Sequence, residues 1–453
     1  MITAPAYQRP DSISAFAAWG TLVVFILLYI LSIFDRQVLA LLLIPIQNDL
    51  GVSDLQLGLL HGVAFSLFYA FAGLALGWAV DRYTKKWLLF FGVVIWAVMT
   101  VACGLAQSFA AMFVARMLVG LGEAVIGPTS FAVLSAIFPK ERLGLVMGLF
   151  YSASNLGSAL IFIGGGAIIT LLNANGGMEF PLLGMLKPWQ AAFVIVGAPG
   201  VVMAFLSFLI VEPKIHRAKA PTTNDRATTG ASAEPPPGVR AFVRENRRIL
   251  SLHIGIYTLL CCNALASMAW APTYLGRTFG WTPLEIGLVI GLSNGVFGLL
   301  GNIFWGWLAD RQVRGGRKDG IYRTYTLALI LGGPVGAATF LIPSPWVAVV
   351  GLCLTWVLLL GSGPFNAALS QFVPPPLRGR ISALSYLSVA MIALGLTPVL
   401  VGLITDRVFG DRAMVGVSIA LVVGLSSISA LVLLRFASRP FIAAIDRNMK
   451  GYA

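Results

Sequence analysis

Long apolar runs separated by short charged or Pro/Gly-rich segments fill most of this 453-residue chain. A helix needs about 20 apolar residues to cross a bilayer, and many of the runs reach that length. The pattern predicts twelve membrane-spanning helices at residues 16–44, 54–80, 87–107, 109–133, 143–172, 189–211, 249–276, 284–309, 323–343, 346–372, 381–404 and 413–437. We therefore expect an all-α integral membrane protein.

A six-residue motif, Gly-Trp-x-x-Asp-Arg, occurs twice, at Gly77–Arg82 and at Gly306–Arg311. Each copy ends an apolar run and precedes a basic cluster. A repeat at half the chain length predicts two pseudo-symmetric six-helix bundles, an arrangement typical of transporters in which one half rocks against the other. We divide the chain into an N-terminal bundle (1–211), a polar linker (212–248) and a C-terminal bundle (249–453).

The composition supports a membrane protein and excludes several function classes. Hydrophobic residues make up 58% of the chain and charged residues 11%. The net charge of +13 comes from basic residues in short loops, so we expect no nucleic-acid partner. Phosphate-binding loops, nucleophile elbows and metal-ligand clusters are missing, and the four cysteines fall inside apolar runs. We expect no enzyme activity, no cofactor and no metal, with a proton gradient as the energy source.

The distribution of Lys and Arg predicts the orientation in the membrane. Placing both termini, the linker and the matching loops on one side collects 25 of the 31 basic residues there. The opposite side keeps Lys187, Arg277, Arg407 and Arg412. The positive-inside rule then makes both termini cytoplasmic in a plasma (inner) membrane. Within the linker, the segment 240–250 predicts either a short amphipathic helix on an anionic leaflet or an ordinary basic flank of the seventh span.

The sequence resembles the major facilitator superfamily, through GWAVDRYTKK (77–86) and GWLADRQVRGGRK (306–318), although Thr84 stands where glycine is usual. Within it, the N-terminal half resembles the Spinster branch, through Asp35-Arg36, residues 46–60 and 116–129, and Arg378–Arg380. That resemblance implies export of lysophospholipids or sphingosine phosphate. The Asp-Arg pair also occurs in organic-anion symporters of the superfamily.

Ionisable residues at membrane depth are costly and usually functional or paired. In this chain they are confined to the N-terminal half: Asp35, Arg36, His61, Arg116 and Glu123. We expect Asp35, Glu123 and His61 to carry proton coupling, unless the carboxylates are held in permanent ion pairs. We expect Arg116, and less strongly Arg36, to bind an anionic headgroup, because guanidinium matches phosphate and carboxylate.

The C-terminal half has no ionisable residue well inside a span. It contributes weakly polar and aromatic candidates for the substrate site: Asn263, Trp270, Asn294, Phe297 and Asn366. A cavity that is charged on one side and apolar or weakly polar on the other suits an amphiphile, with its head on the N-terminal half and its tail on the C-terminal half.

A carboxylate at a helix end can accept hydrogen bonds from the free N–H groups that start a helix of the other half. The resemblance implies that Asp81 meets the start of the eleventh span near Arg380, and Asp310 the start of the fifth near Leu143, holding the cytoplasmic side closed. Arg82, Arg142, Arg311 and Arg378 would complete these gates.

Three transporter functions fit the residues. The first is a proton-linked transporter of amphiphilic lysolipids or sphingoid phosphates that works by alternating access. The second is a proton-coupled transporter of small organic anions, and the third is an exporter of drugs. A membrane-embedded lipid enzyme would need a nucleophile or a metal site. We expect a monomer whose partners are the lipid bilayer and an amphiphilic small molecule.

Overall fold

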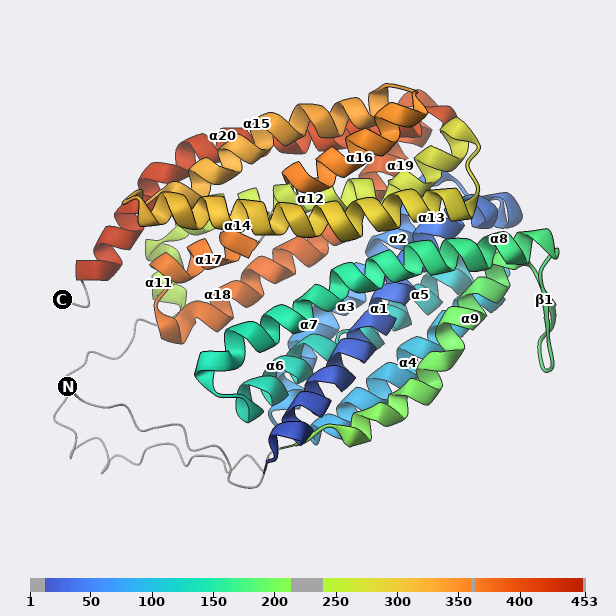
Figure 1. Ribbon diagram of the computed structural model, residues 1–453, viewed down its shortest axis with the longest axis horizontal. Coiled ribbons are helices and arrows are strands. Elements are labelled where there is room, and N and C mark those ends of the chain that lie inside the picture. Colours follow the sequence, from blue (N-terminus) through green and yellow to red (C-terminus); the bar gives the residue numbers. More distant parts are fainter. Residues whose placement is uncertain (1–12, 213–238, 360–362, 451–453) are drawn as a thin grey trace.

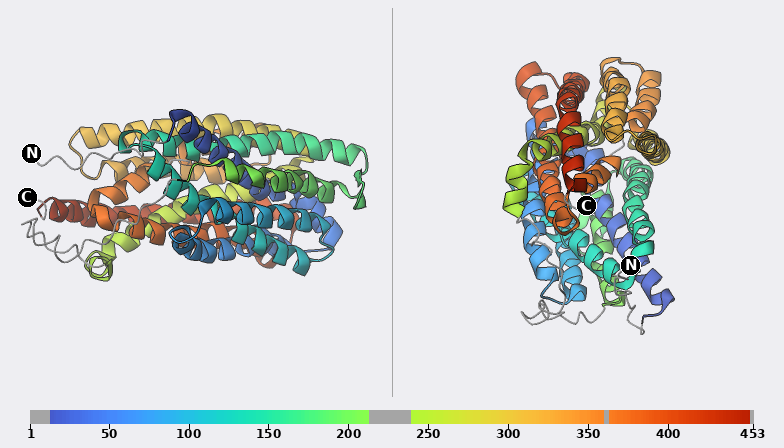
Figure 2. Two further views of the ribbon diagram at one scale, coloured as in Figure 1. Left: turned by 90° about the horizontal axis from the view of Figure 1, so that it is seen from below. Right: turned by 90° about the vertical axis from the view of Figure 1, so that its left-hand side faces the viewer.

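The computed structural model describes residues 13–212, 239–359 and 363–450, and nearly all of them are helical. The twelve predicted spans are confirmed. Eleven helices are long and apolar enough to cross a membrane, and the tenth span is a shorter apolar helix followed, across residues 360–362, by a second short helix. The spans run side by side along the long axis of the molecule (Figures 1 and 2).

The N-terminal half contains the first six spans. In chain order they are α1 (Ala15–Leu50), α2 and α3 (Asp54–His61, Val63–Val80), α4 (Lys85–Leu105), α5 and α6 (Phe109–Glu123, Ile126–Ile137), α7, η1 and α8 (Lys140–Leu160, Ile161–Gly165, Gly166–Ala174), and α9 with η2 (Pro188–Met203, Ala204–Leu209). Helix α4 packs against α5 and α9, and α3 packs against α5.

The C-terminal half contains the other six. They are α12 (Arg247–Phe279), α13, η3 and α14 (Pro283–Leu292, Ser293–Gly298, Leu299–Arg314), α15 (Gly320–Leu341), α16 and α17 (Pro345–Leu359, Gly363–Phe372), α18, η4, α19 and η5 (Pro375–Ser388, Val389–Leu396, Thr397–Leu403, Ile404–Phe409), and α20 (Val415–Lys450), which follows the short η6 (Arg412–Met414). Helix α20 packs along both α12 and α15.

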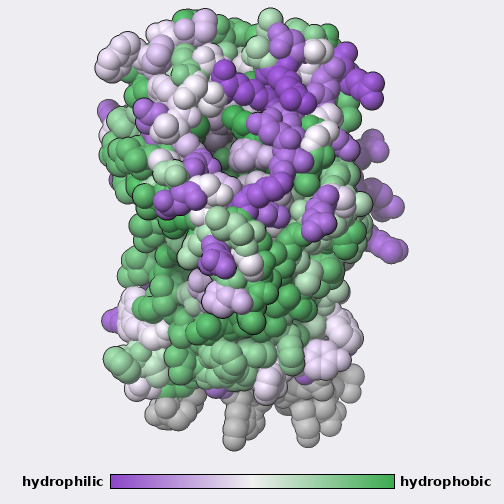
Figure 3. All heavy atoms as spheres, turned by 90° about the vertical axis from the view of Figure 1, so that its right-hand side faces the viewer, coloured by the Kyte–Doolittle hydropathy of each residue, from purple (hydrophilic) through white to green (hydrophobic). Residues whose placement is uncertain are grey.

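The two ends of the bundle differ. Helix α1 begins and α20 ends at one end, which we call the terminal end and which lies on the left in Figure 1. The other end carries a hairpin of β1 (Met178–Phe180) and β2 (Gly184–Leu186), and we call it the hairpin end. Figure 3 views the hairpin end, where hydrophilic residues gather over its upper part while hydrophobic residues cover most of the flanks. The sequence pattern did not predict this hairpin.

Irregular helix geometry is concentrated in spans 2, 5, 8 and 11, at the contact between the two halves. Span 2 breaks at Gly62, between α2 and α3, and spans 5, 8 and 11 contain the π-helical segments η1, η3, η4 and η5. π-helical turns are rare and often mark functional positions. The π-helical segments of spans 5, 8 and 11, and the break in span 2, thus lie in spans that meet across the two halves.

The linker was predicted to span residues 212–248, and its residues 213–238 lie outside the described ranges. Helix α11 (Val239–Glu245) precedes α12, and its Phe242 is buried in the protein core. Arg447 near the end of α20 pairs with Glu245 at 3.8 Å and donates to Asn246 at 3.2 Å. Helix α11 thus buries its aromatic side chain against protein, where the leaflet interpretation expected lipid.

Candidate functional site

A cavity of about 440 Å³ lies between the two halves, and the N-terminal half supplies its charge. Arg36 of α1 and Glu123 at the end of α5 line it and form an ion pair, with Arg36 Nε 2.6 Å from Glu123 Oε2. The Glu123 side chain is fully buried, whereas 20% of the Arg36 side chain is exposed. The second carboxylate oxygen of Glu123 has no hydrogen-bond partner among the described residues. Of the two partners, Arg36 is therefore the one with surface exposed toward the cavity.

Aromatic rings hold the arginine in place. The guanidinium carbon of Arg36 lies 4.8 Å from the ring centre of Phe65 and 4.9 Å from that of Tyr69. The two rings stack with their centres 5.3 Å apart. Such cation–π contacts stabilise a desolvated cation without neutralising it, so Arg36 can still bind an anion.

The wall opposite the ion pair belongs to the C-terminal half and is mostly apolar. Its lining residues are Leu265 of α12, Tyr386 of α18, and Val389, Ala390 and Leu394 of η4. Tyr29, Phe150 and Tyr151 add further aromatic surface from the N-terminal half. The cavity therefore has a charged wall and an apolar wall, as the sequence predicted, but η4 and α18 supply most of the apolar one.

A second charged layer lies behind the cavity and does not line it. Asp35 and Arg116 are each 1% exposed, and Arg116 Nη1 donates to the backbone oxygen of Asp35 at 3.2 Å. Neither Asp35 carboxylate oxygen, nor Arg116 Nε, has a hydrogen-bond partner in the described ranges. Phe65 lies between the two layers, with its ring centre 5.6 Å from the Arg116 guanidinium carbon.

The structure reverses the expected order of the two arginines. Arg36 lines the cavity and Arg116 is enclosed behind it. Helix depth could be read from the sequence, but the direction in which each side chain faces depends on how α1 and α5 pack. His61 ends α2 and is not among the lining residues; its Nδ1 has no partner in the described part of the chain.

The predicted binding residues of the C-terminal half lie away from the cavity. Trp270 is fully buried and donates its indole N–H to the Pro398 carbonyl at 3.0 Å. Asn263 is buried against α20, where it accepts from Ser427 at 3.0 Å. Asn294 is buried within η3, and Phe297 packs against the core. Trp270 and Asn263 thus make helix–helix hydrogen bonds, and Phe297 serves packing. The side chain of Asn366 lies outside the described residues.

The predicted gate residues at the terminal end do not join the two halves in this conformation. No hydrogen bond or ion pair between described residues links Asp81 or Asp310 to the other half. Arg82, just after α3, lies over Trp78 of α3, and Arg311 lies over Trp307 of α14, at 4.0 and 5.3 Å. Arg378 donates to the carbonyl oxygens of Val373 and Ser370, and Arg142 is exposed.

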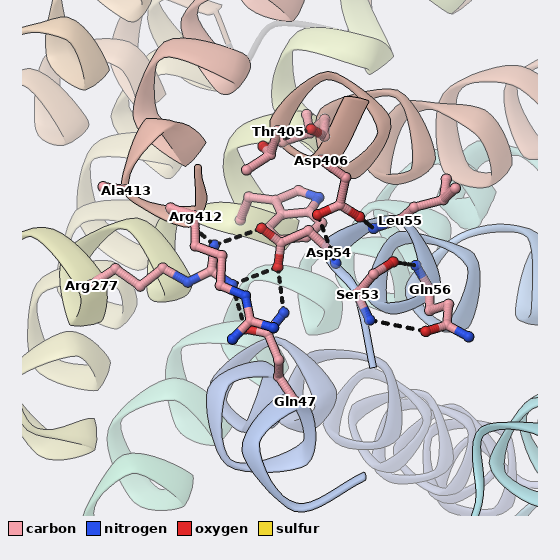
Figure 4. A network of polar contacts seen from close by, with 12 residues as sticks. Gln47, Ser53, Asp54, Leu55, Gln56, Arg277, Thr405, Asp406, Arg412 and Ala413 are labelled. Carbon is pink, nitrogen blue, oxygen red and sulfur yellow. Dashed lines mark hydrogen bonds and ion pairs between the residues drawn. The ribbon is translucent and has the colours of Figure 1, made fainter. Parts of the chain in front are cut away.

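The hairpin end is joined instead by a network around Arg277, which the sequence analysis did not assign to the site (Figure 4). Arg277 at the end of α12 binds both carboxylate oxygens of Asp54 at the start of α2, at 2.5 and 2.8 Å. It also donates to Gln47 at 2.7 Å, and Gln47 donates to Asp54 at 2.7 Å. The Asp54 side chain is fully buried. Arg277 is one of only four basic residues that the positive-inside rule places on the outer side. That exception is the sequence signal that could have identified it as functional.

Asp406 in η5 completes the closure. Its carboxylate accepts from the backbone N–H groups of Asp54 and Leu55, at 3.3 and 2.6 Å (Figure 4). These are free N–H groups of the first turn of α2, which belongs to the other half. The arrangement expected of Asp81 and Asp310 at the terminal end is thus present at the hairpin end.

Close backbone packing accompanies this network. A Cβ built at Gly62 would lie 2.1 Å from the Gly395 carbonyl oxygen, and one at Gly287 would lie 2.0 Å from that of Phe162. Both contacts join opposite halves, through spans 2 and 11 and through spans 8 and 5. Only glycine permits such an approach.

The structure has twelve spans in two halves with a cavity between them. Polar contacts close the hairpin end, and the described residues of the terminal end form no such contacts. This arrangement defines a membrane transporter. The chain belongs to the Major Facilitator Superfamily, whose family profile matches residues 25–392.

Comparisons with known proteins agree with the Spinster resemblance. The chain is 28% identical over 396 residues to an MFS-type efflux pump of Mycolicibacterium smegmatis, covering 87% of this chain and 86% of that one. It is 25% identical to a probable galactarate/D-glucarate transporter of Bacillus subtilis, with 85% of each chain covered. Protein spinster of Drosophila melanogaster is 26% identical over 60% of this chain and 41% of its own length. An inward-facing, unoccupied bacterial homologue of the human lysosomal transporter Spinster superposes with a TM-score of 0.75 at 23% identity, covering 97% and 99% of the two chains.

Proposed function

We propose that this protein is a proton-linked secondary transporter of amphiphilic lipids with an anionic headgroup, of the lysophospholipid or sphingoid phosphate type. The observation that carries the proposal is the division of the cavity into two walls. Arg36 and Glu123 are its only charged lining residues in the described structure, and the facing wall is apolar apart from Tyr386. A phosphate at Arg36 would leave an acyl or sphingoid chain along Val389, Ala390 and Leu394.

Proton coupling follows from competition for Arg36. The ionised Glu123 carboxylate already occupies that guanidinium at 2.6 Å. An anionic headgroup that binds Arg36 displaces it, and an unpaired carboxylate in a buried site is costly. Glu123 then takes up a proton, so that substrate and proton bind together. Asp35, buried without a hydrogen-bond partner among the described residues, is a second proton site behind the cavity.

A second candidate substrate is a small organic acid, because one relative carries the name of a galactarate/D-glucarate transporter. A dicarboxylate would need two cationic partners to be held at both ends. The described cavity lining offers one, Arg36, and this difference favours the lipid.

The test is transport in proteoliposomes with an imposed pH gradient, comparing sphingosine phosphate and a lysophospholipid with galactarate. We expect transport of the lipids and a loss of about 30-fold or more in Arg36→Ala, since removing one partner of a buried charged pair costs 2–5 kcal/mol. Arg314→Gln, an exposed arginine outside the cavity, is the matched control. Transport of galactarate alone would establish the second candidate.

Binding at different pH values tests the coupling separately. Lower pH protonates Glu123 and releases Arg36, so affinity for the anionic lipid should rise as the pH falls. In Glu123→Gln the competing carboxylate is absent, so affinity for the lysophospholipid should be high and should lose the part of the pH dependence that Glu123 causes. A Glu123→Gln protein with the pH dependence of the wild type would remove Glu123 from the coupling.

A further inference from the structure

A basic pocket at the terminal end is separate from the central cavity. It lies between the junction of α11 with α12 and the last turns of α20, with a volume of about 910 Å³. Four arginines line it, Arg248 from α12 and Arg435, Arg439 and Arg447 from α20, together with a single acid, Glu245. We call it the arginine pocket.

Three of the four arginines have no acidic partner among the described residues. Arg447 is the exception, because it pairs with Glu245 at 3.8 Å. Asp446, the neighbouring acid on α20, is paired with Lys318. No ion pair between described residues involves Arg248, Arg435 or Arg439. The pocket therefore concentrates positive charge that the described residues around it do not neutralise.

The four arginine side chains point into the same pocket. Arg435, Arg439 and Arg447 are separated by four and eight residues, which places them along one face of α20. Arg248 faces that stripe from α12, since all four line the same pocket. Guanidinium groups that converge on one volume match the oxygens of a phosphate, which accept paired N–H donors.

Depth in the membrane identifies the source of the phosphate. The part of α20 without charged residues runs from Val415 to Leu434, and 20 residues at 1.5 Å each give about 30 Å, the thickness of the hydrocarbon core. Arg435 is the next residue and so lies at headgroup level. Phe436 lines the same pocket and is 55% exposed, which suits contact with an acyl chain.

We propose that the arginine pocket binds the phosphate headgroup of an anionic phospholipid from the leaflet at the terminal end, the leaflet that the positive-inside rule makes cytoplasmic. The bound lipid would bridge the start of span seven and the end of span twelve. Its phosphate satisfies Arg248, Arg435 and Arg439, and its chains lie beside Phe436.

The experiment measures thermal unfolding of the purified full-length protein in detergent, with added phosphatidylglycerol, phosphatidylcholine or inorganic phosphate. We expect phosphatidylglycerol to raise the midpoint more than the other two. The triple variant Arg248→Gln, Arg435→Gln, Arg439→Gln should lose that difference. The control triple Arg240→Gln, Arg244→Gln, Arg314→Gln removes equal charge outside the pocket and should keep it.

Native mass spectrometry provides the second readout, because it reports the lipids retained by folded molecules only. Each arginine lost should weaken phosphatidylglycerol retention about fivefold. Arg439→Lys keeps the charge but loses the paired donors, and should weaken retention less than Arg439→Gln. Equal retention by the two triple variants would overturn the proposal. Protection by inorganic phosphate equal to that by phosphatidylglycerol would also overturn it, since the ligand would then be a soluble anion.

Discussion

The two ends of the contact between the halves are built from similar parts but are in opposite states. At the hairpin end, Gly62 and Gly287 allow the backbones of opposite halves to touch, and Asp406 and Arg277 bind across the contact. At the terminal end, glycines such as Gly77 and Gly148 face open space, with no atom within 4 Å of a built Cβ. Asp81 and Asp310 form no described link to the other half. The comparison shows a network that closes the hairpin end, and we propose that Asp81 and Asp310 form its counterpart when the terminal end closes.

Removing Arg277 should have the largest effect on this comparison. Arg277→Ala leaves the fully buried Asp54 carboxylate without its bidentate partner, which costs about 3–5 kcal/mol. The hairpin end should open in most molecules, as measured by crosslinking of cysteine pairs across it. Asp54→Asn combined with Arg277→Gln removes both charges and should restore much of the closure. Unchanged crosslinking in Arg277→Ala would show that the network does not hold this end closed.

A side chain at Gly62 should have the next largest effect. Gly62→Val places atoms against the Gly395 carbonyl, and overpacking of this kind costs about 1–3 kcal/mol. Protease accessibility of the hairpin end should increase. Gly424→Ala is the control, because nothing lies within 4 Å of a Cβ built there. A closed hairpin end in Gly62→Val would mean that the backbone contact between spans 2 and 11 is dispensable.

The smallest effects on the conformational equilibrium are expected from Asp406 at the hairpin end and Asp81 at the terminal end. Their substitutions should shift that equilibrium in opposite directions. Asp406→Asn weakens the acceptor of the first N–H groups of α2 and should favour opening of the hairpin end by about 1 kcal/mol. Asp81→Asn should favour the present conformation, if the contacts proposed for Asp81 with the C-terminal half form when the terminal end closes. Fluorescence of a label at either end measures both shifts. A shift of the conformational equilibrium in the same direction in both variants would contradict the proposal that one end opens as the other closes.

Hydropathy and the repeat were sufficient to predict the architecture, because lipid forces every span to be a long apolar helix. They also located the charged residues on the correct half. They did not predict which arginine faces the cavity, since Arg36 and Arg116 differ only in how α1 and α5 are rotated. They misplaced Asn263 and Trp270 at the cavity, because buried polar side chains in a helix bundle also serve helix–helix hydrogen bonds.

The sequence also did not predict that the hairpin end is closed by a polar network. The duplicated Gly-Trp-x-x-Asp-Arg motif lies at the terminal end and predicts contacts between the halves there. No duplicated motif contains Asp54, Arg277 or Asp406. Each of the three lies near the end of a span, where a charged residue is usually solvated. Their pairing depends on the relative position of the two halves, and this relation is a property of one conformation.

The most direct test measures distances across both ends in the same protein, by double electron–electron resonance in lipid bilayers on a cysteine-free background. Labels at Leu171 and Val408 report the hairpin end, and labels at Leu145 and Leu384 report the terminal end; all four side chains are exposed. On changing from wild type to Arg277→Ala, the hairpin-end distance should lengthen and the terminal-end distance should shorten in equal fractions of molecules. A hairpin end that opens while the terminal-end distance stays unchanged would contradict the account.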